Sequence, residues 1–264
     1  MSCGYIRVSC NREEDVETFN DDLMILYKYF AEHLNSFKSL SMRGIWCHYS
    51  KLMNDPAECL AYMNREITHE QIQQFRNCFK DSEDERLRSI YNFCNDQVVS
   101  FVNMQRRESI NRYAFGSLSK SFDDIRMWSH YASSHSGFVV EFDFESDHHF
   151  QEIVYTDYLP KIDVIKIADH LKGVKDNINY FLKDISVKAM AWQHEQEYRI
   201  WRRSPCYYHF DGNNIKSVYF GVNCSLETKA IVGKLIVEIN DKVQYYNMEL
   251  SPNPVRLTFN ENFK

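Results

Sequence analysis

The sequence predicts an α+β fold in which helices dominate the first half of the chain and strands the second. Residues 57–108 contain no Gly or Pro, and their apolar residues recur at spacings of three and four, which is typical of helices. Residues 137–144 (GFVVEFDF) instead alternate with a period of two, which indicates a half-buried strand. With 264 residues and 44% apolar residues, the chain is long enough for one substantial core. We therefore predict a single domain, 1–264, with a helical insertion at about 57–108.

The segment before the insertion predicts a strand, a helix and a second strand. Residues 14–34 mix extended and helical signals, as expected where a strand passes into a helix. Asn35–Arg43 is predicted to form a short helix that Gly44 ends, since Gly is common just past a helix end. Ile45–Ser50 is then predicted to be a strand.

The segment after residue 144 is predicted to consist mostly of strands. Helical signals return at Val164–Leu171 and Ile178–Trp192, and a short helix is expected at Leu226–Val232. The expected strands are Glu197–Arg203, Ser217–Val222, Leu235–Ile239, Val243–Leu250 and Val255–Phe259. Runs of helices followed by runs of strands are typical of an α+β fold.

Charge and hydropathy narrow the classes of protein. Thirty-one basic and 37 acidic residues give a net charge of -6, which argues against a chain-wide electrostatic footprint for nucleic acid or acidic membranes. The N-terminal residues lack the apolar core of a signal peptide, and no run of roughly 18 apolar residues occurs. We expect a soluble, cytoplasmic protein.

Cysteines, histidines and known motifs give negative results. The eight cysteines form no CxxC pair, and the ten histidines form no HxxxH or HExxH, so we expect reduced cysteines and no structural metal. There is also no GxGxxG, GxxxxGK[ST] or GxSxG motif, which leaves dinucleotide-binding, P-loop and α/β-hydrolase folds without support.

Two segments concentrate chemically useful side chains. Met127–Tyr131 brings a thioether, an indole, an imidazole and a phenol into about one helical turn, either as a wall for a planar ligand or as a core helix. In the second segment, an extended Glu195–Trp201 would place Glu195, Glu197 and Arg199 on one strand face. These charges either orient a substrate or neutralise one another on a solvated face.

A third segment contains a turn signature. Pro56 restricts φ, and the side chains of Asn54 and Asp55 can bond to nearby backbone amides or cap the helix that follows. A structural role is the favoured interpretation of this turn.

The same segments resemble a bacterial family known as domain of unknown function 2971 and the related AbiGi-type abortive-infection proteins. The most specific block is SLSKSFDDIRMWSHYASSHSGFVVEFD. LMNDPAE precedes it in the chain, and VYTDYLP, KAMAWQHEQEYRI and IKSVYFGVNCS follow it, in an order similar to that of the family. The resemblance implies a bacterial protein of a phage-defence or toxin-antitoxin type system.

A more distant resemblance is to ADP-ribosyltransferases. Residues 27–45 are similar to their opening strand, short helix and Gly, and Glu195-Gln196-Glu197 is similar to their Glu-x-Glu motif. The resemblance implies a split, mixed or antiparallel sheet and NAD as a substrate. In such enzymes the final Glu holds the nicotinamide ribose, which becomes oxocarbenium-like in the transition state.

By this resemblance, Glu197 holds the ribose, Glu195 orients the acceptor and Tyr131 or Trp128 stacks on nicotinamide. Either Lys28 or Tyr29 approaches the phosphates or ribose of NAD. The full expectation assigns catalysis to Glu197, Glu195 and Tyr131, and NAD binding to Lys28, Tyr29, Trp128, His130, Asn54 and Arg199.

Two other functions stay open. One is a non-catalytic sensor, antitoxin or partner-binding component of a defence system. The other is a metal-dependent hydrolase or nuclease that uses Glu141, Asp143 and a histidine. The sequence does not identify the acceptor, whether protein, nucleic acid or small molecule, or the oligomeric state.

Overall fold

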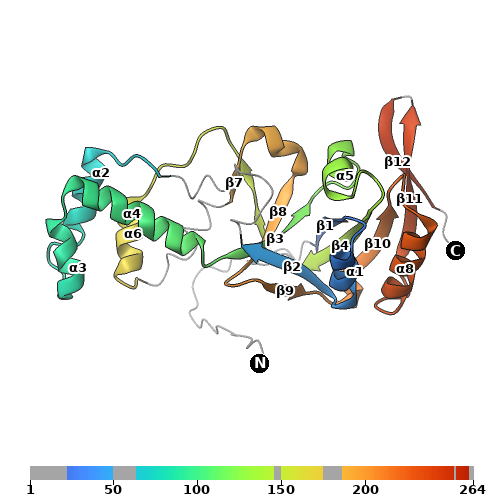
Figure 1. The fold of residues 1–264 in the computed structure, drawn as a ribbon, viewed down its shortest axis with the longest axis horizontal. Helices are drawn as coiled ribbons and strands as arrows, with labels where there is room; N and C mark the ends of the chain where they lie inside the picture. The colour runs from blue at the N-terminus through green and yellow to red at the C-terminus, as the bar shows by residue number, and fades with distance from the viewer. Residues whose placement is uncertain (1–22, 50–63, 146–149, 175–185, 253, 262–264) are drawn as a thin grey trace.

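A computed structural model describes residues 23–49, 64–145, 150–174, 186–252 and 254–261. It is a mixed α+β fold built on a mostly antiparallel open sheet with helices (Figure 1), which confirms the predicted class. Within these residues, no helix combines the length and the apolar character needed to cross a bilayer.

The main sheet runs in the order β12-β11-β10-β4-β1-β3-β2-β9, with β8 beside β3 and β5 beside β8. All neighbours are antiparallel except β10 and β11. The strands are β1 (Leu23–Phe30), β2 (Gly44–Tyr49), β3 (Ala114–Ser119), β4 (Phe138–Glu145), β5 (Phe150–Glu152), β8 (Glu197–Arg202), β9 (Cys206–His209), β10 (Ile215–Phe220), β11 (Gln244–Pro252) and β12 (Val255–Glu261).

The sheet is weakly joined between β1 and β3. These strands share one pair, Tyr27 with Ser119, whereas β1 pairs with β4 along all eight of its residues. Near this junction the Lys28 Nζ donates a hydrogen bond to the Ser117 carbonyl oxygen at 2.8 Å. A seam therefore separates the half of the sheet that contains β4 from the half that contains β8.

The main core lies on the face of the sheet covered by α1 (Leu34–Ser41) and α8 (Leu226–Val237). The alternation expected in β4 is confirmed. One face of the strand contributes four side chains to this core: Phe138, Val140, Phe142 and Phe144. On the other face, Val139 packs in a second hydrophobic cluster with Trp128 and Tyr219. Both faces of β4 are thus covered near its start.

The α1–β2 connection differs from the expected one. Arg43, with φ 47°, adopts the left-handed conformation after the helix, and Gly44 is already the first residue of β2. A Cβ at position 44 would lie 2.8 Å from the Cβ of Tyr207. Gly44 is therefore needed for the close approach of β9.

The helices of the insertion form a second body with a core of its own at one end of the molecule (Figure 1). It contains α2 (His69–Asn77), α3 (Glu85–Ser89), the 3-10 helix η3 (Ile90–Asn92), α4 (Asn95–Ile110) and α6 (Val164–Leu171). Phe75, Phe79 and Val102 are fully buried in this core, together with Ile167 of α6. The insertion is thus completed by a helix from later in the chain.

Two predicted elements are wrong. Leu235–Ile239 was predicted to be a strand, but α8 continues into this segment and ends at Val237. A short apolar run is compatible with either a buried helix or a strand, so it does not distinguish the two. The helix predicted at Ile178–Trp192 is replaced, where the structure describes it, by β7 (Val187–Lys188) and the 3-10 helix η4 (Met190–Glu195). β7 pairs in parallel with β6 (Val154–Tyr155), a partner that no local pattern indicates.

Candidate functional site

A buried ionic network lies at the start of β8. The side chains of Lys188, Glu195, Glu197 and Arg199 are only 4%, 4%, 3% and 1% exposed. Burying an isolated charge costs several kcal/mol. The two anions and the two cations of this network can be buried because they pair directly with one another. The charges thus neutralise one another, as one interpretation expected, but they do so in the interior and not on a solvated strand face. We call the following set the Glu197 network: Ser117, Tyr131, Lys188, Glu195, Glu197 and Arg199.

Each of the two carboxylate oxygens of Glu197 accepts two hydrogen bonds. Oε1 accepts from Ser117 Oγ at 2.6 Å and from Arg199 Nε at 2.8 Å. Oε2 accepts from Arg199 Nη2 at 3.1 Å and from Lys188 Nζ at 3.2 Å. The backbone N–H of Glu197 donates to the Tyr155 hydroxyl at 2.7 Å. This carboxylate is held in one position from several directions.

Glu195 connects the network to the surface. Its Oε2 accepts a hydrogen bond from Lys188 Nζ at 2.5 Å, and its Oε1 accepts one from the Tyr131 hydroxyl at 2.6 Å. Tyr131 lies on α5 (Ile125–Tyr131) and is 36% exposed. The phenol of Tyr131 is thus the most exposed member of the network.

Strand register and one strained turn build this arrangement. Ser117 lies opposite Arg199, and Ser119 opposite Glu197, on the paired strands β3 and β8. Gln196, with φ 43°, ends η4 in the left-handed conformation, so Glu195 belongs to a 3-10 helix and not to the extended strand that we expected. The turn still brings Glu195 to the same lysine as Glu197.

The protonation equilibria follow from burial and from these partners. Burial raises the pKa of Glu197 above its usual value, although Lys188 and Ser117 oppose the shift. Burial alone would lower the pKa of Lys188, but Glu197 and Glu195 outweigh it and raise that pKa. Burial and the hydrogen bond to Glu195 raise the pKa of Tyr131. Lys188 and Tyr131 therefore keep their protons at neutral pH.

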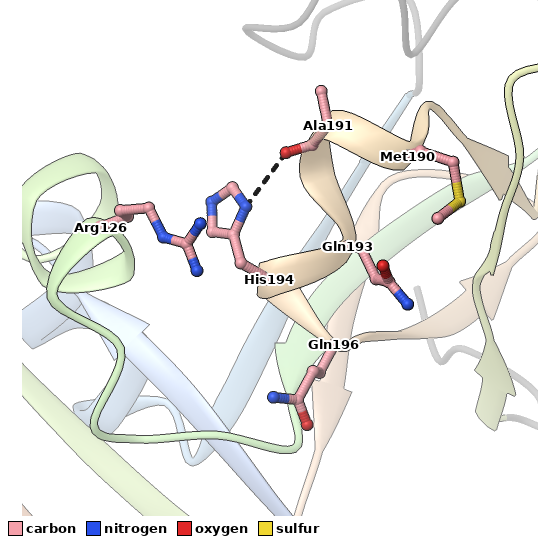
Figure 2. A pocket seen from close by; sticks show the side chains of 6 residues that line it. All are labelled: Arg126, Met190, Ala191, Gln193, His194 and Gln196. Carbon is pink, nitrogen blue, oxygen red and sulfur yellow. Dashed lines mark hydrogen bonds between the residues drawn. The ribbon is translucent and has the colours of Figure 1, made fainter.

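An open depression of about 620 Å³ borders η4 (Figure 2). Its lining is mainly polar and consists of Arg126, Met190, Ala191, Gln193, His194 and Gln196. His194 and Gln196, which line the depression, flank Glu195 of the network in the chain.

The His194 imidazole borders this depression. Its Nδ1 lies 3.2 Å from the Ala191 carbonyl oxygen. Its Nε2 has no hydrogen-bond partner among the residues that the structure describes. Figure 2 shows the guanidinium of Arg126 turned toward this imidazole.

The remaining residues expected on α5 and β1 divide between the core and the surface. Trp128 is fully buried, and its Nε1 donates to the Phe122 carbonyl oxygen at 2.6 Å. The Tyr29 hydroxyl donates to the Ser121 carbonyl oxygen at 3.0 Å, and its ring packs on the edge of Trp128. His130 is exposed. The core interpretation of α5 thus holds for Trp128, while Tyr131 joins the Glu197 network.

Three further expected residues are placed differently. Lys28 adjoins the network through the backbone of Ser117, and burial lowers its pKa. Arg199 is a full member of the network and also stacks over the Phe115 ring at 4.1 Å. Asn54 lies outside the described residues.

Sequence reasoning missed Lys188, Ser117 and Tyr155. Lys188 lies in a segment expected to be helical, and Ser117 and Tyr155 stand 80 and 42 residues before Glu197. No local pattern predicts such pairings. The resemblance of KAMAWQHEQEYRI to a family block was the only signal near Lys188.

The acids of β4 do not form a metal site. Glu141 accepts a hydrogen bond from the Tyr219 hydroxyl at 2.7 Å, and Asp143 pairs with Lys216 at 3.3 Å. In the part of the chain that the structure describes, no group of three or more His, Cys, Asp or Glu residues is placed to hold a metal ion.

The fold and the site thus define an α+β protein with a fixed, buried carboxylate pair. Residues 127–200 match the model of a family described as a protein of unknown function, DUF2971. This segment contains every member of the Glu197 network except Ser117. Searches of curated proteins and of solved structures found no match.

Proposed function

We propose that this protein is an NAD-dependent, ADP-ribosyltransferase-like enzyme in which Glu197 is the carboxylate at the reacting centre. The observation that supports this most is the fixation of Glu197 by Ser117, Lys188 and Arg199, with a second carboxylate, Glu195, on the same lysine. A second supporting feature is the weak junction between β1 and β3, next to Ser117, because the resemblance to ADP-ribosyltransferases implies a split sheet.

The reaction explains why a fixed carboxylate is useful. When the bond between the ribose and nicotinamide breaks, nicotinamide leaves with the bonding electron pair and positive charge develops on the ribose. A carboxylate that is already oriented stabilises this charge without reorganising. Because both oxygens of Glu197 already accept hydrogen bonds, a ribose hydroxyl must replace one of the present donors.

The depression beside η4 offers suitable groups for the rest of NAD. A diphosphate needs cationic or amide donors, and the guanidinium of Arg126 and the side-chain amides of Gln193 and Gln196 line this space. Tyr131, the most exposed member of the network, donates its hydroxyl hydrogen to Glu195, and this pair is suited to orient the acceptor group. These residues fit NAD as a substrate.

The test is nicotinamide release from NAD⁺, and adduct mass in the presence of cell extract, with wild type and Glu197→Gln. We expect the variant to lose about 100-fold or more of the activity, as is typical when a group that stabilises transition-state charge is removed. Glu141→Gln is the matched control, since Glu141 is also a strand carboxylate that accepts a hydrogen bond from a hydroxyl group, that of Tyr219, as Glu197 accepts one from Ser117. Circular dichroism confirms that each variant folds.

No nicotinamide release and no adduct with wild type would contradict the proposal. Equal activity of wild type and Glu197→Gln would contradict the role of Glu197.

A second candidate function is a non-catalytic sensor, antitoxin or partner-binding protein. It is favoured by the saturation of both Glu197 oxygens, which leaves the network closed. This function predicts binding of NAD or a protein without turnover, and a cellular effect that survives Glu197→Gln. The role in phage defence rests on resemblance alone, and infection of cells that express wild type or Glu197→Gln tests it.

A further inference from the structure

Two cysteines lie opposite each other on the last two strands at one edge of the main sheet. Cys47 of β2 and Cys206 of β9 are direct partners in the antiparallel register. Opposed residues in such pairs have Cα atoms about 4.5 to 5.5 Å apart and side chains on the same face. A disulfide needs Cα atoms about 4.4 to 6.8 Å apart. The backbone therefore already has a spacing that a disulfide can bridge.

The two thiols differ in their access to solvent. Cys47 is fully buried, and burial raises the pKa of its thiol to about 11. Cys206 is half-buried, so an oxidant in solution reaches it first. The other described cysteines, Cys78, Cys94 and Cys224, lie outside paired strands. The pair is thus distinct among the thiols that the structure places.

We propose that Cys206 and Cys47 form a reversible disulfide when the protein meets a hydroperoxide. The Cys206 thiolate attacks a peroxide oxygen, the O–O bond breaks, and the leaving oxygen takes a proton, which gives a sulfenic acid and water or an alcohol. The sulfur of Cys47 then attacks the sulfur of Cys206. The S–O bond breaks, and the departing hydroxide takes the Cys47 proton to become water. The two sulfurs are oxidised and the peroxide is reduced.

The bond would act on the strand that carries the candidate site. The Cys47 thiol donates a hydrogen bond to the Ile200 carbonyl oxygen of β8 at 3.8 Å, and Ile200 follows Arg199 of the Glu197 network. Oxidation removes this donor. It also joins β9, the terminal strand of the sheet, covalently to β2. The inference is independent of the proposed NAD chemistry.

Peptide mapping of the full chain after hydrogen peroxide treatment tests this inference. After free thiols are blocked, trypsin releases residues 44–51 with Cys47 and residues 204–216 with Cys206. We expect these peptides joined, with the loss of two hydrogen atoms, and separated again by a thiol reductant. Cys206→Ser should abolish the linked species, and Cys94→Ser, which changes an exposed cysteine, should retain it. A linkage of Cys206 to a different cysteine, or its conversion to sulfinic acid without linkage, would overturn the proposal.

Hydrogen exchange tests the effect on β9. Amides of peptide 204–216 should exchange several-fold more slowly in the oxidised protein and regain their original rate after reduction. The same treatment of Cys206→Ser should leave exchange unchanged. Linked peptides with unaltered exchange in wild type would overturn the claim that the bond holds β9 to β2.

Discussion

Two strands of the main sheet, β8 and β4, carry charged residues at alternating positions but use them differently. On β8, Glu197 and Arg199 are buried and form a closed network. On β4, Glu141 and Asp143 are half-buried, with a tyrosine and an exposed lysine as partners. The same period of two therefore leads to a buried ionic network in one strand and to partly solvated acids in the other.

The difference comes from what covers each strand. Lys188 of β7 pairs with Glu197 of β8 and also with Glu195 of η4, which accepts from Tyr131 of α5. Tyr155 of β6 accepts a hydrogen bond from the backbone of β8. Water can still reach the acids of β4, so their charges need fewer protein partners. An alternating pattern identifies the faces of a strand, but the elements packed on those faces decide whether a charge is structural or solvated.

The largest difference is expected from neutralising one acid on each strand. Glu197→Gln leaves Lys188 and Arg199 with one buried anion and should cost about 3 to 5 kcal/mol of unfolding free energy. Glu141→Gln removes the charge of an acceptor near water and should cost about 1 kcal/mol. Urea unfolding followed by tryptophan fluorescence measures both, and equal losses would remove the distinction between the two strands.

The lysines that pair with the acids of β8 and β4, Lys188 of β7 and Lys216 of β10, should show the same contrast in stability. Lys188→Met removes the cation that Glu195 and Glu197 share and leaves Arg199 as the remaining cation on Glu197. Adding Glu195→Gln should therefore recover about 1 to 3 kcal/mol. Lys216→Met removes the half-exposed partner of Asp143 and should change stability by less than about 1 kcal/mol. A double-mutant cycle measures the coupling; additive effects of the Lys188 and Glu195 changes would contradict a connected network.

The tyrosine donors separate stability from activity. Tyr131→Phe and Tyr219→Phe each remove a hydroxyl that donates to a carboxylate, so each should cost about 1.5 to 3 kcal/mol. Under the proposed function, only Tyr131→Phe should also lower nicotinamide release, by about 10-fold or more. Equal activity of the two variants would place Tyr131 among residues with a purely structural role.

The smallest effect is confined to alkaline pH. Burial raises the pKa of Tyr155 to about 12 from the usual 10.0, so above about pH 10 the unfolded chain releases this proton while the folded chain keeps it. The unfolded state then binds fewer protons, and stability falls as pH rises toward about 12. Tyr155→Phe should make this decline shallower in urea titrations, whereas Tyr158→Phe, at a side chain 84% exposed, should leave it unchanged.

Much of the fold was predictable because local patterns record local burial. The period of two at residues 138–144 and the helix Val164–Leu171 were predicted correctly. The segments containing Tyr131, Glu195, Glu197 and Arg199 were singled out from their residue types. The run at Leu235–Ile239 failed because apolar residues alone do not separate a strand from a helix end.

The assembly of the site was decided by tertiary structure. Strand register places Ser117 opposite Arg199, where its hydroxyl donates to Glu197, 80 residues later in the chain. The left-handed Gln196 returns Glu195 to Lys188, and β6 brings Tyr155 to the backbone of β8. Amino-acid order specifies which side chains carry charge and which strand face they occupy. Whether those charges meet water or one another depends on long-range packing, because only the elements that cover a face set its exposure and supply its partners.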